Sequence, residues 1–212
     1  MEKTREPVAS LILYNLLKWS VISPMLHTYF WGRIYGAQNV PLSGPLVVVS
    51  NHASDYDPPI LASCMNRPVA FMAKEELFQV PGLKQVISLY GAYPVRRGES
   101  DRAAMRSALS SLEDGWATGL FLDGTRSPDG RIHNPKLGAA LIAAKAKVPI
   151  LPVSLWGTQA IVKKGSIVPK PVPVTIRIGE VIPAPSSTKR EELEAITQKC
   201  VEVIHGLHDL GR

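Results

Sequence analysis

Short apolar segments alternate with amphipathic segments along most of this chain, and this alternation restricts the fold more than any other feature. The run LVVVS at residues 46–50 is rich in β-branched residues, as expected of a buried strand. Segments with helical periodicity begin near residue 58 and recur at 82–90, 101–114 and 136–146. Further strands are expected at residues 69–73, 92–95, 119–123, 149–156 and 173–179. The alternation predicts an α/β fold in which helices sandwich a mixed, mostly parallel sheet.

The C-terminal segment predicts one long amphipathic helix. Thr188 and Glu191 have the spacing of a capping box, which marks a helix start. After them, apolar residues recur at helical intervals up to Leu207. We therefore expect a helix that begins near Thr188 and packs one face on the sheet.

The N-terminal run from Val8 to Trp31 is apolar and aromatic, but Pro24 and several polar residues interrupt it. We expect two short helices that break near Pro24 and lie in a membrane interface. The aromatic residues favour the interface, and the accompanying lysines and arginines can contact lipid phosphates. A single membrane span and a helix pair packed on the core are the alternatives. No clear cleavage site follows, which argues against a cleaved signal peptide. The expected division is a membrane-associating motif at 1–36 and an α/β domain at 37–212.

The formal charge of +6 indicates an anionic partner, which is a nucleic acid, an anionic membrane or a phosphorylated substrate. Cys64 and Cys200 are the two cysteines, too few for a disulfide framework, and they fit a reducing, cytoplasmic-side location. His205 and His208 lie close together on the last helix, where we interpret them as surface side chains. No metal site is expected from these residues.

The segment NHASDYDPP at residues 51–59 is the first candidate for chemistry. A strand is expected to end just before His52, and Asp57 follows five positions later. A carboxylate that folds back onto the imidazole fixes its tautomer and raises its basicity, as a general base requires. Two structural alternatives remain open: Asp57 before Pro58 is also a good helix N-cap, and Asp55 is a second candidate for that cap.

The segment GAYPVRRGES at residues 91–100 is the second candidate. It carries Arg96 and Arg97 from a short strand into a turn flanked by glycine. Guanidinium groups match phosphate oxygens bidentately, so this pair is a candidate phosphate site. A pair of solvated surface charges is the alternative.

The segment LFLDGTRSPDGR at residues 120–131 is the third candidate. After a hydrophobic strand it contains Asp123, Gly124, Thr125 and Arg126. Gly124 permits a tight turn, and ligands of open α/β sheets usually bind beyond the strand ends. An ordinary turn explains Asp-Gly equally well. If the strands before all three segments are parallel, the loops meet at one edge of the sheet. No nucleophile elbow, P-loop or dinucleotide fingerprint occurs in the sequence.

The chain resembles the glycerolipid acyltransferase family, typified by bacterial 1-acylglycerol-3-phosphate acyltransferases, over about residues 30–185. His52 and Asp57 match the family's H-x4-D signature. The further matching blocks are YPVRR (93–97) with Gly98, FLDGTR (121–126), NPKLGAALIA (134–143) and VPILPV (148–153). The third block departs from the usual F-P-E-G-T-R-S, because Leu122 replaces proline and Asp123 replaces glutamate. This departure bears on the choice of acceptor.

The resemblance implies a role for each matching residue. His52, oriented by Asp57, takes the proton of the acceptor hydroxyl as it attacks the thioester of acyl-CoA or acyl carrier protein. The phosphate-binding residues implied are Arg96, Arg97, Arg126 and, less directly, Lys136. Asp123, Gly124 and Thr125 shape the pocket, and Pro152 lies near the acyl donor. No metal or other cofactor is implied.

The expected reaction places the acyl group on the sn-2 hydroxyl of lysophosphatidic acid, at the cytoplasmic face of a membrane whose lipids are partners. Glycerol 3-phosphate and other lysophospholipids remain alternative acceptors. A hydrolase with the same His/Asp pair is a rival, as is a basic module that binds membrane or nucleic acid. No nucleic-acid partner is expected, because the largest group of aromatic residues, five of 14, lies in the apolar N-terminal run rather than among the lysines and arginines.

Overall fold

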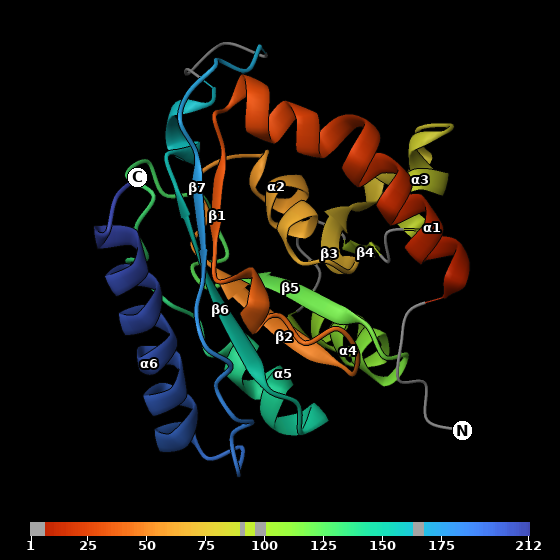
Figure 1. The fold of residues 1–212 in the computed structure, drawn as a ribbon. Helices are drawn as coiled ribbons and strands as arrows, with labels where there is room; N and C mark the ends of the chain where they lie inside the picture. The colour runs from red at the N-terminus through yellow and green to blue at the C-terminus, as the bar shows by residue number, and fades with distance from the viewer. Residues whose placement is uncertain (1–6, 90–91, 96–100, 163–167) are drawn as a thin grey trace.

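A computed structural model describes residues 7–89, 92–95, 101–162 and 168–212. Its seven-stranded sheet has the order β1-β7-β6-β2-β5-β3-β4, and every neighbouring pair is parallel except β6 with β7 (Figure 1). The predicted mixed, mostly parallel sheet is therefore confirmed. The strands are β1 (Arg33–Tyr35), β2 (Leu46–Ser50), β3 (Val69–Lys74), β4 (Tyr93–Val95), β5 (Ala117–Phe121), β6 (Ile150–Trp156) and β7 (Thr175–Ile178).

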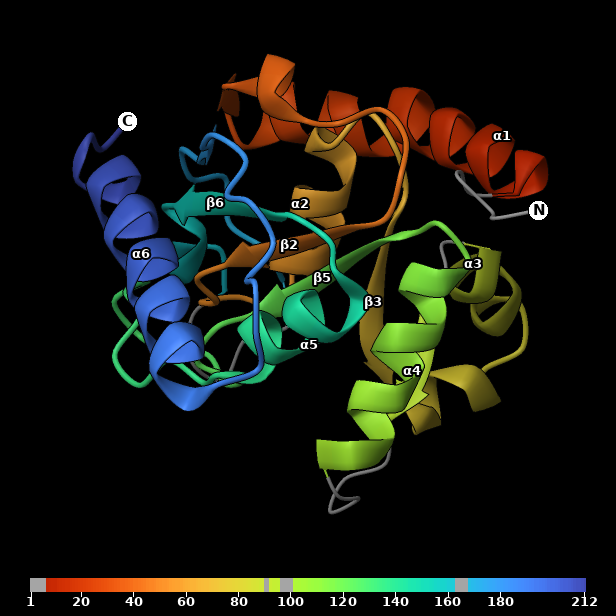
Figure 2. The ribbon, with the colours of Figure 1, turned by 90° about the horizontal axis from the view of Figure 1, so that it is seen from below.

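Helices cover both faces of the sheet, because alternate residues of each strand point to opposite sides. Val47 and Val49 of β2 pack in one core cluster, whereas Leu46 and Val48 pack in the other. The first cluster includes α4 (Asp101–Glu113), α5 (Gly138–Ala146) and α6 (Arg190–Asp209). The second includes α2 (Asp57–Cys64) and the end of the N-terminal helix (Figure 2). A short α3 (Leu83–Leu89) lies beside α1.

Most element boundaries follow the sequence, with specific exceptions. β2 has the predicted bounds, whereas β5 begins and ends two residues earlier than expected. The edge strand β1 was not expected from the sequence. The capping box predicted from Thr188 and Glu191 is wrong, because α6 begins at Arg190 and no side chain caps it. The adjacent carboxylate of Glu192 reaches back instead and accepts hydrogen bonds from Ser186 and Ser187.

The N-terminal segment is one continuous helical run, so the break predicted at Pro24 is wrong. It comprises α1 (Val8–Leu17) followed by π-helical turns at Lys18–Ile22 and Met25–Tyr29. Pro24 itself has helical angles, φ −56° and ψ −48°. The wide π turns on both sides accommodate a residue that has no N–H to donate.

One face of this helix packs on the domain and the other is exposed. The Tyr14 hydroxyl donates to the Ala62 carbonyl at 3.0 Å, and Lys18 Nζ donates to Asn66 Oδ1 at 2.8 Å. The run Val8–Tyr29 is long and apolar enough to cross a membrane by length and composition, and 17% of its most apolar window is buried. Its exposed large apolar residues are Val8, Ile12, Leu16, Trp19, Val21 and Tyr29. This helix is consistent with membrane association.

A glycine in the middle of the sheet admits a neighbouring aromatic ring. Gly119 on β5 pairs with Phe71 on β3. A Cβ at position 119 would lie 2.2 Å from Phe71 Cε1, which is too close for two carbon atoms that are not bonded to each other. The space beside Gly119 is therefore already occupied by the Phe71 ring.

Candidate active site

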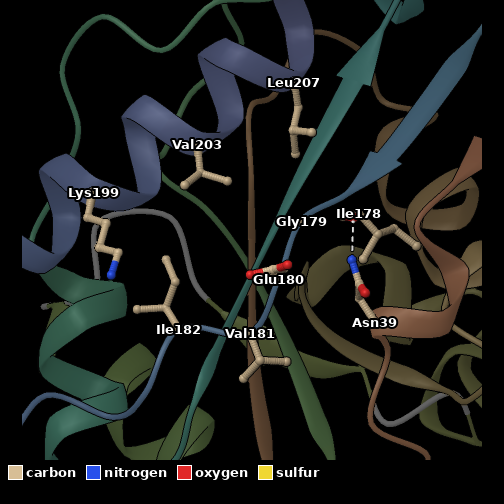
Figure 3. Close-up of a pocket in the computed structure, with 9 residues that line it drawn as sticks. All are labelled: Asn39, Ile178, Gly179, Glu180, Val181, Ile182, Lys199, Val203 and Leu207. Atoms are coloured by element: carbon tan, nitrogen blue, oxygen red, sulfur yellow. Dashed lines mark hydrogen bonds between the residues drawn. The ribbon is translucent and has the colours of Figure 1, made fainter.

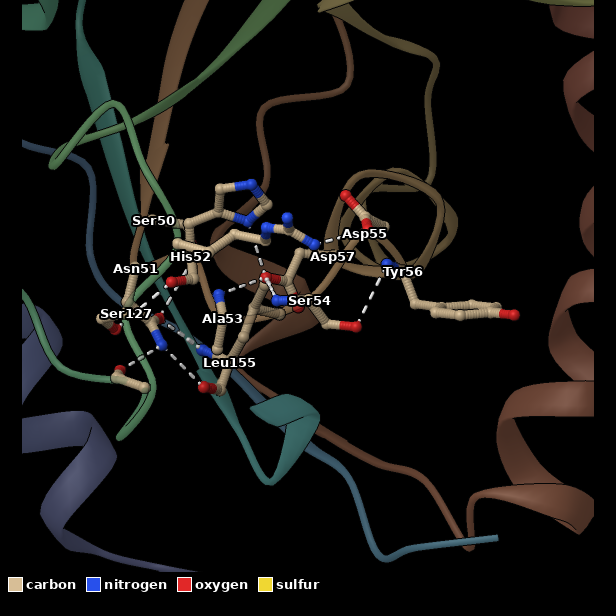
Figure 4. A network of polar contacts seen from close by, with 12 residues as sticks. Ser50, Asn51, His52, Ala53, Ser54, Asp55, Tyr56, Asp57, Ser127 and Leu155 are labelled. Atoms are coloured by element: carbon tan, nitrogen blue, oxygen red, sulfur yellow. Dashed lines mark hydrogen bonds and ion pairs between the residues drawn. The ribbon is translucent and has the colours of Figure 1, made fainter. Parts of the chain in front are cut away.

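His52, in the loop between β2 and α2, forms a hydrogen-bonded pair with Asp57, the first residue of α2 (Figure 4). His52 Nδ1 lies 2.8 Å from Asp57 Oδ2, and the two side chains are 17% and 0% exposed. A carboxylate only accepts hydrogen bonds, so Nδ1 carries the proton and Nε2 keeps its lone pair. The local sequence thus produces an imidazole that is oriented to accept a proton at Nε2.

The backbone around Asp57 explains why its carboxylate turns toward His52. Asp57 Oδ2 also accepts the amide protons of Ala53 at 2.6 Å and Ser54 at 2.8 Å. Asp57 is the first residue of α2, and no side chain caps that helix. The N-cap alternatives for Asp57 and Asp55 are therefore both wrong, because Asp57 binds the loop before the helix and Asp55 binds Arg126.

The imidazole of His52 also lies against an aromatic ring. Its centroid is 3.9 Å from that of Phe121 at the end of β5, with 12° between the planes. Phe121 in turn stacks on Phe71 with a centroid distance of 5.6 Å. The ring stack and the bond to Asp57 together restrict the orientation of His52. Phe121 belonged to a matching block, but its contact with His52 was not predicted.

Asn51 joins the loop that contains His52 (residues 51–56, called the histidine loop below) to two other segments. Its Nδ2 donates to the carbonyls of Gly130 at 2.7 Å and Leu155 at 2.8 Å, and its Oδ1 accepts from the Leu155 amide at 2.8 Å. The Ser127 amide donates to the His52 carbonyl at 2.8 Å. The only sequence signal for Asn51 was its position next to His52, and asparagine is also an ordinary loop residue.

The loop after β5 adopts the predicted tight turn. Gly124 has φ +66°, a left-handed conformation that favours glycine. The carboxylate of Asp123 accepts hydrogen bonds from the amides of His133 at 3.0 Å and Asn134 at 2.9 Å, so it fixes the following part of the loop. Thr125 follows this turn and is exposed.

Two of the three predicted segments meet at one edge of the sheet. β2 and β5 are parallel, and Ser50 pairs with Phe121 at their ends. Arg126 reaches the histidine loop, where its Nη1 lies 2.5 Å from Asp55 Oδ2. The strand before the arginine pair, β4, is parallel to its neighbour β3. Arg96 and Arg97 themselves lie outside the described residues.

The remaining predicted site residues occupy two different environments. Lys136 has an exposed side chain, and its amide donates to the Leu122 carbonyl at 2.8 Å. Pro152 is buried in β6 and pairs with Val49 of β2, so it lies inside the sheet. Among the described residues no group of three or more His, Cys, Asp or Glu side chains has an arrangement suited to a metal ion.

A cavity of about 400 Å³ lies between α6 and the end of β7 (Figure 3). Its lining is mostly apolar, and Glu180 and Lys199 are its charged members. It contains none of the predicted site residues. The candidate chemistry is therefore in the open loop region around His52 rather than in this cavity.

The acyltransferase family model matches residues 32–156, more than half of the chain. A chloroplastic 1-acyl-sn-glycerol-3-phosphate acyltransferase of Brassica napus is 34% identical over 151 residues, which cover 70% of this chain and 43% of that protein. This chain thus spans less than half of that relative's length. The 1-acyl-sn-glycerol-3-phosphate acyltransferase of Bacillus subtilis is 27% identical over 139 residues, covering 64% of this chain and 69% of that one.

A solved structure is similar over nearly the whole chain. The crystal structure of the 1-acyl-sn-glycerophosphate (LPA) acyltransferase PlsC from Thermotoga maritima matches with a TM-score of 0.77 and 30% identity. The match covers 94% of this chain and 79% of that one. By its sequence match and by its fold, this chain belongs to the acyltransferase family.

Proposed function

We propose that the protein transfers a fatty acyl group from acyl-CoA or acyl carrier protein to the sn-2 hydroxyl of lysophosphatidic acid, forming phosphatidic acid. The observation that carries this proposal is the 2.8 Å contact between His52 Nδ1 and Asp57 Oδ2, which leaves Nε2 free to accept a proton. The names of the matched relatives and of the similar solved structure support lysophosphatidic acid as the acceptor.

In the proposed reaction His52 acts as a general base. Its Nε2 takes the proton of the acceptor hydroxyl while the oxygen bonds to the thioester carbonyl carbon. Collapse of the tetrahedral adduct breaks the carbon–sulfur bond, and the imidazolium returns the proton to the leaving thiolate. Asp57 stabilises the transient imidazolium, and base catalysis of this kind contributes about 10² to 10⁴-fold. We propose that no metal or other cofactor takes part.

The acceptor phosphate is expected to bind the arginines near His52. Arg126 is half exposed and lies next to the histidine loop through its contact with Asp55. Guanidinium and phosphate form charge-assisted bidentate hydrogen bonds. Arg96 and Arg97 are proposed to join Arg126 in this role, with Lys136 as a further contact. Gly124, Thr125 and Asp123 shape the adjacent turn, and Pro152 is proposed to act near the acyl donor.

The N-terminal helix is proposed to hold the enzyme at the cytoplasmic face of a membrane. The exposed apolar residues of Val8–Tyr29 form a face suited to lipid contact. Both acceptor and product carry acyl chains and reside in the bilayer. Membrane lipids are thus the surroundings from which the acceptor is drawn.

The test is acyl transfer from labelled acyl-CoA, and separately from acyl carrier protein, with lysophosphatidic acid, glycerol 3-phosphate or no acceptor. We expect product only with lysophosphatidic acid and loss of activity in His52→Ala. His133→Ala is a matched control, because His133 is an exposed histidine paired with Asp129. Thioester loss without acceptor would identify a hydrolase, and preferential use of glycerol 3-phosphate would reassign the acceptor.

A further inference from the structure

The histidine loop carries a second carboxylate that turns away from the imidazole. Asp57 is fully buried against His52, whereas Asp55 is 74% exposed and contacts Arg126. Figure 4 shows Asp55 projecting from the same loop as His52, just before Asp57 at the start of α2. The two aspartates therefore have different partners. Asp57 contacts the proposed base His52, and Asp55 contacts the proposed phosphate-binding residue Arg126.

The Arg126 guanidinium can readily exchange its contact with Asp55 for a contact with another anion. Both side chains are more than half exposed, so solvent screens the pair and its net stabilisation is small. A carboxylate and a phosphate accept the same guanidinium N–H groups. An acceptor phosphate that engages Arg126 fully must displace Asp55 or share the guanidinium with it.

We infer that Asp55 is a specificity-determining residue, a resident counter-anion that competes with the acceptor phosphate for Arg126. The inference rests on the proposed function. Coulomb repulsion grows with the product of the charges, so Asp55 opposes a dianionic phosphomonoester about twice as strongly, in energy, as a monoanionic phosphodiester. Phosphatidic acid keeps the same phosphomonoester, so Asp55 also opposes product binding and promotes product release.

Asp55→Asn is the direct test, because the amide keeps the size of the side chain and removes its charge. We expect the KM for lysophosphatidic acid and the inhibition constant of phosphatidic acid to fall by about two- to fivefold. The inhibition constant of lysophosphatidylglycerol, a monoanion, against lysophosphatidic acid should fall by only about the square root of that factor. Glu194→Gln is the matched control, because Glu194 is an exposed carboxylate paired with an arginine on α6.

The second arm is the same substitution in an Arg126→Gln background. If Asp55 acts by competing for Arg126, Asp55→Asn lowers the KM by a clearly smaller factor there, and the remaining effect reports the direct repulsion between Asp55 and the phosphate. An unchanged KM in the single variant would overturn the inference, and a raised KM would show that Asp55 orients Arg126 for the acceptor instead. Failure of the proposed function gives a different result, namely no lysophosphatidic acid-dependent transfer by the unaltered protein.

Discussion

Asn51 and Leu155 exchange hydrogen bonds across the β2–β6 junction, the side-chain amide accepting from and donating to the same backbone residue at 2.8 Å in each direction. A further bond from Asn51 to the Gly130 carbonyl brings in the loop after β5. The residue next in sequence is His52. The backbone that carries the candidate base is therefore tied to two other segments of the fold, β6 and the loop after β5.

Asn51→Ala should weaken both folding and activity. It removes the three hydrogen bonds to Gly130 and Leu155 and leaves their buried backbone groups unpaired, which costs about 1–3 kcal/mol of unfolding free energy per buried group. We expect a lower Tm and a kcat reduced about tenfold or more with little change in KM. Denaturant unfolding and steady-state kinetics check this, with Asn134→Ala at an exposed site as the control. A normal kcat in a destabilised variant would limit Asn51 to a role in folding.

Asp57→Asn should lower kcat by about 10² to 10⁴-fold, because an amide does not hold His52 in the tautomer that leaves Nε2 free. The buried amide also binds the donors from Ala53 and Ser54 less well than a carboxylate. Kinetics with saturating acceptor give the change in kcat, and circular dichroism tests whether the variant folds. A folded variant with full activity would contradict the general-base mechanism.

Stability should fall on mild acidification because of His208. Burial lowers the pKa of His208 below its ordinary value of 6.5, and the nearby Arg131 lowers it further, although Asp209 and Asp129 oppose this. The unfolded chain therefore binds a proton at a higher pH than the folded one. The penalty is absent well above pH 6.5 and develops as the pH falls through 6.5 toward the folded pKa.

The measurement is Tm between about pH 5 and pH 8 for the unaltered protein and for His208→Leu. We expect a shallower decline in the variant, because leucine does not titrate. Equal slopes in the unaltered protein and His208→Leu would mean that other groups govern the pH dependence.

Leu16→Glu should weaken membrane association. Leu16 is exposed on the face of the N-terminal helix that we propose contacts lipid, and a charge there opposes insertion. We expect less protein to sediment with anionic phospholipid vesicles. Leu210→Glu is the matched control, because Leu210 is similarly exposed beyond the end of α6. Complete release of the unaltered protein by salt alone would show that binding is purely electrostatic.

The parts of the site that were predictable from the sequence are local. His52 and Asp57 are five residues apart between a clear strand and a helix, so their pairing required only one loop to close. Asn51 was not assigned because its partners lie 79 and 104 residues away. Such contacts depend on strand order, which a single sequence does not specify.

The errors in the fold have similar causes. β1 is three residues long and pairs with β7, about 140 residues later, so no local pattern marked it. Proline normally interrupts a helix, but the π turns beside Pro24 maintain the helical run. At α6 the sequence spacing favoured Glu191, whereas the position of Ser186 and Ser187 selects Glu192.

The glycine at position 119 restricts which substitutions this protein can accept during evolution. Gly119 leaves room for Phe71, Phe71 stacks on Phe121, and Phe121 stacks on His52. Any larger residue at 119 would displace the first ring and, through the second, rotate the imidazole. Positions 71 and 119 should therefore evolve as a pair, with a bulkier residue at one tolerated only when the other becomes smaller. Gly119 thereby shares the selective pressure on the proposed catalytic histidine, although two rings separate them.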